Sequence, residues 1–241
     1  MLLLAFDTAT PSVTVALHDG DAVVAEESAV DGRRHGEILA VFIDKVLRSA
    51  GAGREDLTAI AVGTGPGPYT GLRAGLVTAR VLASALAIRI DGVCSLDVIA
   101  AAACAEAART EAAPTEAART EAARTEAPPT GHGGTDFLVA TDARRREVYW
   151  ARYCAAGQRT DGPQVSRPAD LPRGLPVAGH AALMYPELSD RPLNPAFPAA
   201  AQLAAISAAR LSRGEPAHPA VPLYLRRPDA REPGKPKRVT P

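Results

Sequence analysis

The sequence predicts an α/β protein made of two related half-domains. Along the first hundred residues, short apolar segments typical of strands alternate with longer segments whose apolar residues recur every three or four positions. Residues 3–16 also align without a gap on residues 138–151, which places Asp7 on Asp142. Each of these segments opens one half of the chain and has the pattern of an apolar strand, an aspartate, a turn and an alternating strand. Two copies of one hairpin predict two copies of one sheet.

The elements of the first half follow from local patterns. Three strands joined by tight turns form an antiparallel meander, and the alignment pairs Val13 of its second strand with Val148. A helix follows with one buried face and ends at two glycines, and the next strand leads through a glycine-rich loop into a second amphipathic helix. We expect strands at 2–6, 12–20, 21–30, 57–63 and 87–95, and helices at 37–47 and 70–87.

Composition sets limits on the kinds of function. The chain has 241 residues, with 27 Lys and Arg against 27 Asp and Glu, so there is no overall attraction to nucleic acid or membrane. Its three cysteines have no C-x-x-C spacing, which argues against a disulfide framework and a zinc knuckle. The N-terminus lacks a basic start and a long apolar run, and no segment approaches the roughly 20 apolar residues of a membrane helix. A cytoplasmic protein without membrane contact is expected.

Residues 106–130 consist of five pentads related to EAART. A five-residue period rotates about 140° per repeat on a helix, so no continuous apolar face forms. The expected organisation is a first half-domain at 1–105, a solvated and disordered insertion at 106–135, a smaller second half-domain at 136–225, and a basic, proline-rich tail at 226–241.

Two regions are candidates for binding phosphate. Two half-domains that each start with such a hairpin are the layout of the actin-like, ribonuclease H-like (ASKHA) fold, in which nucleotide phosphates lie between the two hairpin turns. The candidates in these turns are Asp7, Thr8, Thr10 and Asp142, although Ala9 stands where such enzymes commonly have glycine. An ordinary turn is the competing interpretation.

The second region is the stretch GTGPGPYTGLR, residues 63–73. Thr70 is placed to cap the following helix, whose N-terminus could attract an anion. The stretch lacks the lysine of a Walker loop, and its prolines remove N–H donors, which favours a rigid strand-to-helix corner. Gly71 and Gly75 lie one turn apart and would leave a flat strip for another helix. On this hypothesis Gly75→Leu preserves the fold and prevents pairing with a partner.

Other chemistry has little support. The five histidines show no metal-binding spacing, and no G-x-S-x-G elbow is present. The three arginines at 144–146 extend from the turn of the second hairpin. They suit either a solvated turn or a contact with an anion or RNA.

The chain resembles the bacterial TsaB (YeaZ) family. The motifs that carry the resemblance extend from residue 3 to 226 and are AFDTAT, RRHGEIL, GTGPGPYTGLRAGL, GVCSLDVIA, DARRREVYWARY and VPLYLR. The glycine motif is shared with the catalytic paralogue TsaD, whose metal-binding histidine pair would correspond to Ser95 and Ile99 here. Neither residue is such a ligand.

The resemblance implies a non-catalytic subunit for threonylcarbamoylation of adenosine 37 in tRNAs that read codons starting with A. It implies a heterodimer with TsaD, a complex with the ATPase TsaE, a homodimer when alone, and contact with tRNA through the complex. No cofactor is expected, although ATP or ADP with Mg could bind near the subunit interface. The interface candidates, on the helices after RRHGE and after GPGPYTG, are His35, Glu37, Tyr69, Thr70, Gly71, Leu72, Arg73, Gly75 and Leu76.

Two other functions remain open from the residues. The first is an active actin-like phosphotransferase that holds Mg-ATP with Asp7, Thr8 and Asp142. The second is a peptidase, for which neither a histidine pair nor a triad is present.

Overall fold

The computed structural model describes residues 1–32, 34–112 and 134–226 and contains two mixed sheets of five strands each. The first half contains β1 (Leu3–Asp7), β2 (Ser12–His18), β3 (Val23–Val30), α1 (His35–Ser49), η1 (Arg54–Asp56), β4 (Ala59–Gly63), α2 (Tyr69–Leu86), β5 (Arg89–Val93) and α3 (Ser95–Ala112). The second contains β6 (Phe137–Asp142), β7 (Val148–Tyr153), β8 (Arg159–Ser166), η2 (Pro168–Asp170), β9 (Val177–Ala178), α5 (Ala181–Met184), η3 (Pro186–Leu188), β10 (Pro192–Leu193) and α6 (Ala200–Ser212).

The two sheets share one topology. The strand order is β3-β2-β1-β4-β5 in the first sheet and β8-β7-β6-β9-β10 in the second. In each, an antiparallel three-stranded meander is extended by two parallel strands on the far side of its first strand. The repeated order confirms the ribonuclease H-like fold of two related units that the internal similarity predicts.

The hairpins differ by one residue, which corrects the ungapped alignment. Asp7 pairs with Thr14 across the first hairpin, whereas Asp142 pairs with Val148 across the second. The first turn therefore contains one residue more, and Thr14, rather than Val13, is the counterpart of Val148. Because side chains alternate between the faces of a sheet, the ungapped match would place the whole second strand on the wrong face.

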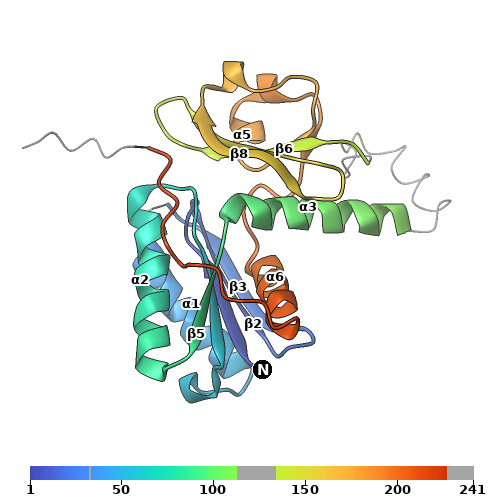
Figure 1. Ribbon diagram of the computed structural model, residues 1–241. Helices are drawn as coiled ribbons and strands as arrows, with labels where there is room; N and C mark the ends of the chain where they lie inside the picture. Colours follow the sequence, from blue (N-terminus) through green and yellow to red (C-terminus); the bar gives the residue numbers. More distant parts are fainter. Residues whose placement is uncertain (33, 113–133, 227–241) are drawn as a thin grey trace, which may run out of the picture.

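The helices are exchanged between the two units. Helices α1 and α2 cover one face of the first sheet, and α6, from the end of the chain, packs on its other face against β1 and β2. Helix α3 packs instead on the second sheet, where Ile99 joins Phe137 and Tyr153 in one core. Figure 1 shows α3 between the two sheets with α6 beneath it. The core of each half thus depends on a helix from the other half of the sequence.

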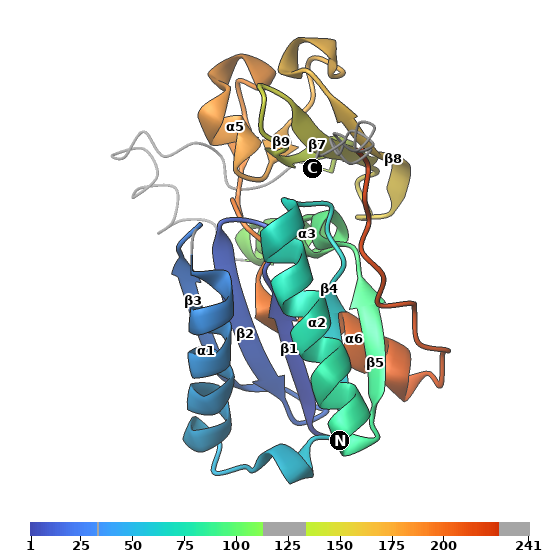
Figure 2. The ribbon, with the colours of Figure 1, turned by 90° about the vertical axis from the view of Figure 1, so that its left-hand side faces the viewer.

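Part of the pentad insertion continues α3, which runs to Ala112. The remainder at 113–133, Arg33, and the tail at 227–241 lie outside the described residues. Before the tail, residues 215–226 run as an extended segment beside β5 up to the second half (Figure 2). No helix in the described part of the chain has the length and apolar character that crossing a bilayer requires.

Candidate functional site

Asp7, at the end of β1, is enclosed by its own chain. The side chain is fully buried, the backbone N–H of Ala9 donates to Oδ1 at 2.6 Å, and the Ser95 hydroxyl donates to Oδ2 at 2.5 Å. Burial raises the pKa of this carboxyl, and the hydrogen bonds from Ser95 and Ala9 partly oppose the rise. Since both oxygens already accept a hydrogen bond and neither reaches the surface, Asp7 does not fit the role of a Mg²⁺ ligand.

Thr8 packs closely against helix α2. Its hydroxyl donates to the carbonyl of Gly71 at 2.7 Å and accepts the N–H of Gly75 at 3.0 Å. In a regular α-helix these two backbone groups bond to each other, so the hydroxyl contacts both partners of one turn of the helical ladder. These two hydrogen bonds therefore hold the turn after β1 against α2.

The glycines of the 63–73 stretch are explained by this close approach. A Cβ at Gly71 would lie 2.6 Å from the Thr8 carbonyl oxygen, and one at Gly75 would lie 2.6 Å from Thr8 Oγ1. A Cβ at Gly63 would overlap the Asp7 carboxylate, and one at Gly67 the Ala9 carbonyl. The strip at Gly71 and Gly75 thus faces Thr8 of the same chain, and its assignment to a partner helix is wrong.

The stretch forms the rigid corner that its prolines predict. The Ser95 N–H donates to the Gly65 carbonyl at 2.8 Å, and the Gly65 N–H donates to Ser95 Oγ at 3.2 Å. Helix α2 begins at Tyr69 after Pro68 without a side-chain cap, so the expected capping role of Thr70 is wrong. The corner, the turn after β1 and the start of α3 form one hydrogen-bonded unit.

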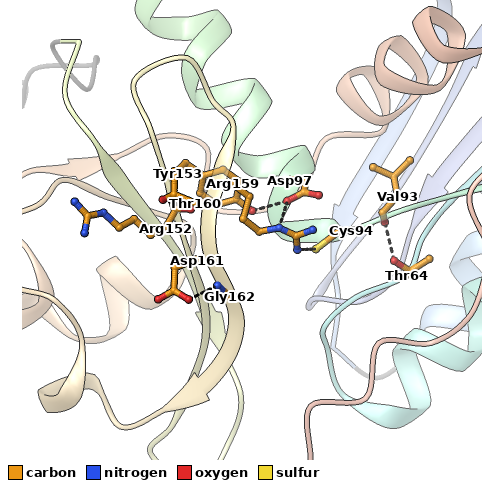
Figure 3. Close-up of polar contacts among 10 residues, drawn as sticks. All are labelled: Thr64, Val93, Cys94, Asp97, Arg152, Tyr153, Arg159, Thr160, Asp161 and Gly162. Carbon is orange, nitrogen blue, oxygen red and sulfur yellow. Dashed lines mark hydrogen bonds and ion pairs between the residues drawn. The ribbon is translucent and has the colours of Figure 1, made fainter.

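Helix α3 fastens this unit to the second sheet. Asp97, in its first turn, accepts a hydrogen bond from Tyr153 at 2.7 Å and lies 3.6 Å from Arg159 (Figure 3). The Arg159 guanidinium also reaches Cys94 Sγ at 3.7 Å. Burial raises the pKa of the Cys94 thiol to about 11. Sequence reasoning missed this junction because Tyr153 and Arg159 are distant from α3 in the chain.

Ser95 and Ile99, which the resemblance aligns with the histidine pair of TsaD, both have structural roles. Ser95 is fully buried with its hydroxyl on Asp7, and Ile99 is fully buried in the core of the second half. Among the described residues, no group of three or more His, Cys, Asp or Glu side chains is arranged to hold a metal ion.

A cavity of about 210 Å³ lies between the two hairpin turns, lined by Thr8, Thr10, Pro11, Gly32, His35, Pro68, Thr70, Gly71 and Arg144. His35 Nε2 lies 3.0 Å from the Thr10 carbonyl. Asp7 and Asp142 do not line the cavity. Asp142 instead accepts the N–H of Arg144 at 2.7 Å within its own turn. The structure therefore brings Thr8 and Thr10 together with His35 in the lining of this cavity, and neither carboxylate is part of that lining.

The interface candidates divide into buried and accessible residues. Leu72 and Leu76 are 1% and 3% exposed and lie in the core beneath α1 and α2, so with the two glycines they are corrected to core positions. The accessible candidates lie near the N-terminal ends of α1 and α2 and are His35, Glu37, Tyr69, Thr70 and Arg73.

Sequence reasoning missed an apolar surface on the outer side of α1 and α2. Val41, Val77 and Val81 are 62%, 56% and 62% exposed there. A groove of about 250 Å³ between the helices is lined by Ala40, Ile43, Asp44, Leu47, Arg54, Thr78 and Leu82. We call these valines and this groove the α1–α2 face. The i, i+4 spacing of Val77 and Val81, on a helix whose other side is already apolar, was the available signal.

The C-terminal segment adds Tyr224 beside this face. Tyr224 stacks on Tyr69 with ring centroids 5.6 Å apart, and the Arg73 guanidinium lies 3.9 Å above the Tyr69 ring. Farther along α2, Arg80 donates to the Ala220 carbonyl at 2.7 Å. The VPLYLR motif therefore fastens the end of the described chain along α2.

The sequence of this chain is similar to those of known proteins. The family model described as TsaD, tRNA N6-adenosine threonylcarbamoyltransferase, matches residues 23–127. An uncharacterized protein of Mycobacterium tuberculosis is 42% identical over 237 residues, which cover 95% of this chain and 93% of that protein. The tRNA threonylcarbamoyladenosine biosynthesis protein TsaB of Escherichia coli is 31% identical over 153 residues, which cover 64% of this chain and 55% of that protein.

A solved structure extends the similarity to the whole fold. YeaZ from Pseudomonas aeruginosa superimposes with a TM-score of 0.70 at 27% sequence identity, over 93% of this chain and 99% of that chain. The chain belongs to the TsaB (YeaZ) family.

Proposed function

We propose that this chain takes part in the biosynthesis of threonylcarbamoyladenosine in tRNA as a non-catalytic scaffold subunit. Its role is to hold a catalytic TsaD-family subunit in a competent state while adenosine 37 is modified, in tRNAs that read codons starting with A. The names of the relatives support the pathway.

One observation carries the non-catalytic part of the proposal. The polar groups of the turn after β1, where an actin-like enzyme would hold nucleotide and metal, are engaged within the chain. Asp7 bonds to Ala9 and Ser95, and the Thr8 hydroxyl bonds to the backbone of α2 at Gly71 and Gly75. Recruiting them for catalysis would require breaking the contacts that connect the first sheet, α2 and α3.

We assign the TsaD-family subunit to the α1–α2 face. Three largely exposed valines on α1 and α2, together with the mainly apolar groove between these helices, form a surface that favours burial against another protein. Two helices lying side by side suit a partner that presents a similar helix pair. The accessible residues His35, Glu37, Tyr69, Thr70 and Arg73 lie at one end of this surface and would form its polar margin.

The assignment is tested by the double variant Val77→Glu/Val81→Glu. Each valine would contribute about 1.5 kcal/mol or more when fully buried, so the loss of both weakens binding by about a hundredfold or more. We expect co-purification with the TsaD-family protein to be abolished. Val30→Glu, at a valine 65% exposed on β3, is the matched control and should leave the complex intact. Equal binding by the double variant and the control would refute the assignment.

The same proposal includes a complex with a TsaE-family ATPase, a homodimer through the α1–α2 face when the partner is absent, and tRNA contact within the complex. Size-exclusion chromatography with light scattering tests the homodimer: the wild-type chain should elute as a dimer, and Val77→Glu/Val81→Glu as a monomer. A monomeric wild-type chain would contradict this part.

An active phosphotransferase is the second candidate, favoured by the cavity between the two hairpin turns. Calorimetric titration of the isolated chain with ATP and Mg²⁺ separates the two. We expect no micromolar binding, and binding that Asp7→Ala abolishes would establish the alternative instead.

A further inference from the structure

Residues 215–226 form an extended segment that follows the first half and ends on the second (Figure 2). Beside β5, the Gly92 N–H donates to the His218 carbonyl at 3.0 Å, and the His218 N–H donates to Asp91 Oδ1 at 2.8 Å. A Cβ at position 92 would lie 2.4 Å from the Pro219 carbonyl oxygen, so this close approach requires glycine. The segment is therefore built into the edge of the first sheet.

The VPLYLR motif, residues 221–226, continues the segment from this edge to the second half. The Leu223 N–H donates to the Thr64 carbonyl at 2.9 Å, and Arg73 Nε donates to the Tyr224 hydroxyl at 3.1 Å. Both contacts lie where β4 leads through the rigid corner into α2. As far as Tyr224, the segment is thus anchored on the first half.

Arg226 attaches the end of the segment to the second half. Its guanidinium donates to the carbonyl of Ala143 at 3.0 Å and to that of Arg144 at 3.5 Å, and it forms an ion pair with Glu147. The side chains of Arg226 and Glu147 are 26% and 33% exposed, so water and salt reach this ion pair. Because a partly exposed ion pair is weak, this end of the segment is the one that detaches most easily.

The other connections between the halves lie apart from Arg226. The chain passes from the first sheet to the second between β5 and α3 and returns at residues 194–199, and Val98 of α3 shares a core with Leu203 of α6. In the view of Figure 2, α3 lies between this return and the C-terminal segment. The halves can therefore turn about the connections near α3, and a contact away from them restricts the turn.

The turn that Arg226 holds also forms one wall of the cavity between the two hairpin turns. Arg144 lines this cavity together with Thr8 and Thr10 of the first hairpin turn. The width of the cavity therefore depends on how the two halves are oriented.

We propose that residues 215–226, which we call the latch, hold the two halves in one orientation, with Arg226 as the releasable end. While Arg226 is attached, the cavity between the hairpin turns stays narrow. When Arg226 detaches, the halves turn and the cavity widens, while the latch remains bound to the first half. This inference goes beyond the proposed function and needs neither a partner nor tRNA.

The test is a distance measurement by double electron–electron resonance in the full-length chain. Spin labels are placed at Asp21→Cys, between β2 and β3, and at Glu187→Cys, in η3, which are exposed positions on different halves. Cys104→Ala/Cys154→Ala removes the two other half-buried thiols, and the raised pKa of Cys94 protects it from labelling.

With the latch intact at low salt, we expect one narrow distribution of distances between the labels. Arg226→Ala removes the ion pair and both hydrogen bonds, so it should broaden the distribution or add a second population. Salt at about 1 M, where the Debye length is about 3 Å, should produce a smaller change in the same direction, because it screens the ion pair and leaves the bonds to the carbonyls. Glu147→Gln should behave like high salt for the same reason.

The matched control is Arg48→Ala, which removes an exposed arginine whose ion pair with Asp44 lies within α1 and does not join the halves. It should leave the distribution unchanged, and urea unfolding verifies that both arginine variants are folded. The same distribution in Arg226→Ala and wild type, or equal broadening in Arg226→Ala and Arg48→Ala, would overturn the inference. Because the isolated chain is measured, neither result bears on the complex with the TsaD-family subunit.

Discussion

Gly75→Ala tests whether Thr8 packs closely against α2. Replacing an interior helical glycine with alanine normally stabilises a protein by up to about 1 kcal/mol. Here the new Cβ would lie 2.6 Å from Thr8 Oγ1, so the hydroxyl must move and lose its bonds to Gly71 and Gly75. Each lost bond costs about 1 kcal/mol and the overpacking about 1–3 kcal/mol, which leaves a net destabilisation of about 2–4 kcal/mol.

A double-mutant cycle isolates the contact. With Thr8→Ala in place the hydroxyl is absent, and the nearest side-chain atom is the Cβ of residue 8 at an ordinary distance of 3.7 Å. In that background Gly75→Ala should be neutral or stabilising, so that the sign of its effect reverses. Gly36→Ala, in the first turn of α1 with no atom within 4 Å of the new Cβ, is the control and should not destabilise the protein.

Urea unfolding followed by circular dichroism measures all of these free energies. A Gly75→Ala protein more stable than wild type would show that the glycine faces open space. That result would refute the packing of Thr8 on α2 and restore the interpretation of Gly71 and Gly75 as a strip for another subunit.

Two further predictions concern titrating groups. Burial raises the pKa of Asp7 above 3.8, so the stabilisation from its protonated form is complete below pH 3.8 and is lost as pH rises through the folded-state pKa. The stability of wild type relative to Asp7→Asn should therefore fall as pH rises above 3.8, and urea titrations showing a constant difference would contradict this. Because burial raises the pKa of Cys94 from 9.0 to about 11, its thiolate fraction at pH 8 is about a hundredfold below that of an unperturbed thiol. Since a thiolate of higher pKa is also the stronger nucleophile, mass spectrometry should show iodoacetamide modifying Cys94 about tenfold more slowly in the folded than in the unfolded protein, and equal rates would contradict the raised pKa.

Local patterns predicted the elements of the first half up to β5, but they did not predict helix α3 (Ser95–Ala112). The meander, the two amphipathic helices and the proline-rich corner all follow from alternation, helical spacing and backbone restriction, which depend on near neighbours in sequence. The repeated hairpin also predicted two related sheets, although the one-residue difference between the turns lay beyond an ungapped comparison, since Thr14 and Val13 are both compatible with a strand.

Contacts between distant segments were predicted poorly. Helical spacing identified Leu72 and Leu76 as apolar but left open whether the sheet or a partner covers them. Gly75 packs against Thr8, which is 67 residues away in the sequence. The packing of α6 on the first sheet likewise depends on residues at opposite ends of the chain. Several site candidates were wrong for this reason. A motif specifies residue types, whereas the fold decides which of those residues are buried and which are exposed.

Reconstitution of tRNA modification with Asp7→Asn tests the central claim, that this chain supports catalysis without performing it. TsaD- and TsaE-family proteins, tRNA, ATP and the threonylcarbamoyl donor would be combined with no added chain, with wild type, or with the variant. The account predicts that modification requires the chain and that Asp7→Asn supports it as well as wild type. Loss of modification with Asp7→Asn, while its heterodimer still forms, would show that the carboxylate acts in the reaction and would contradict the account.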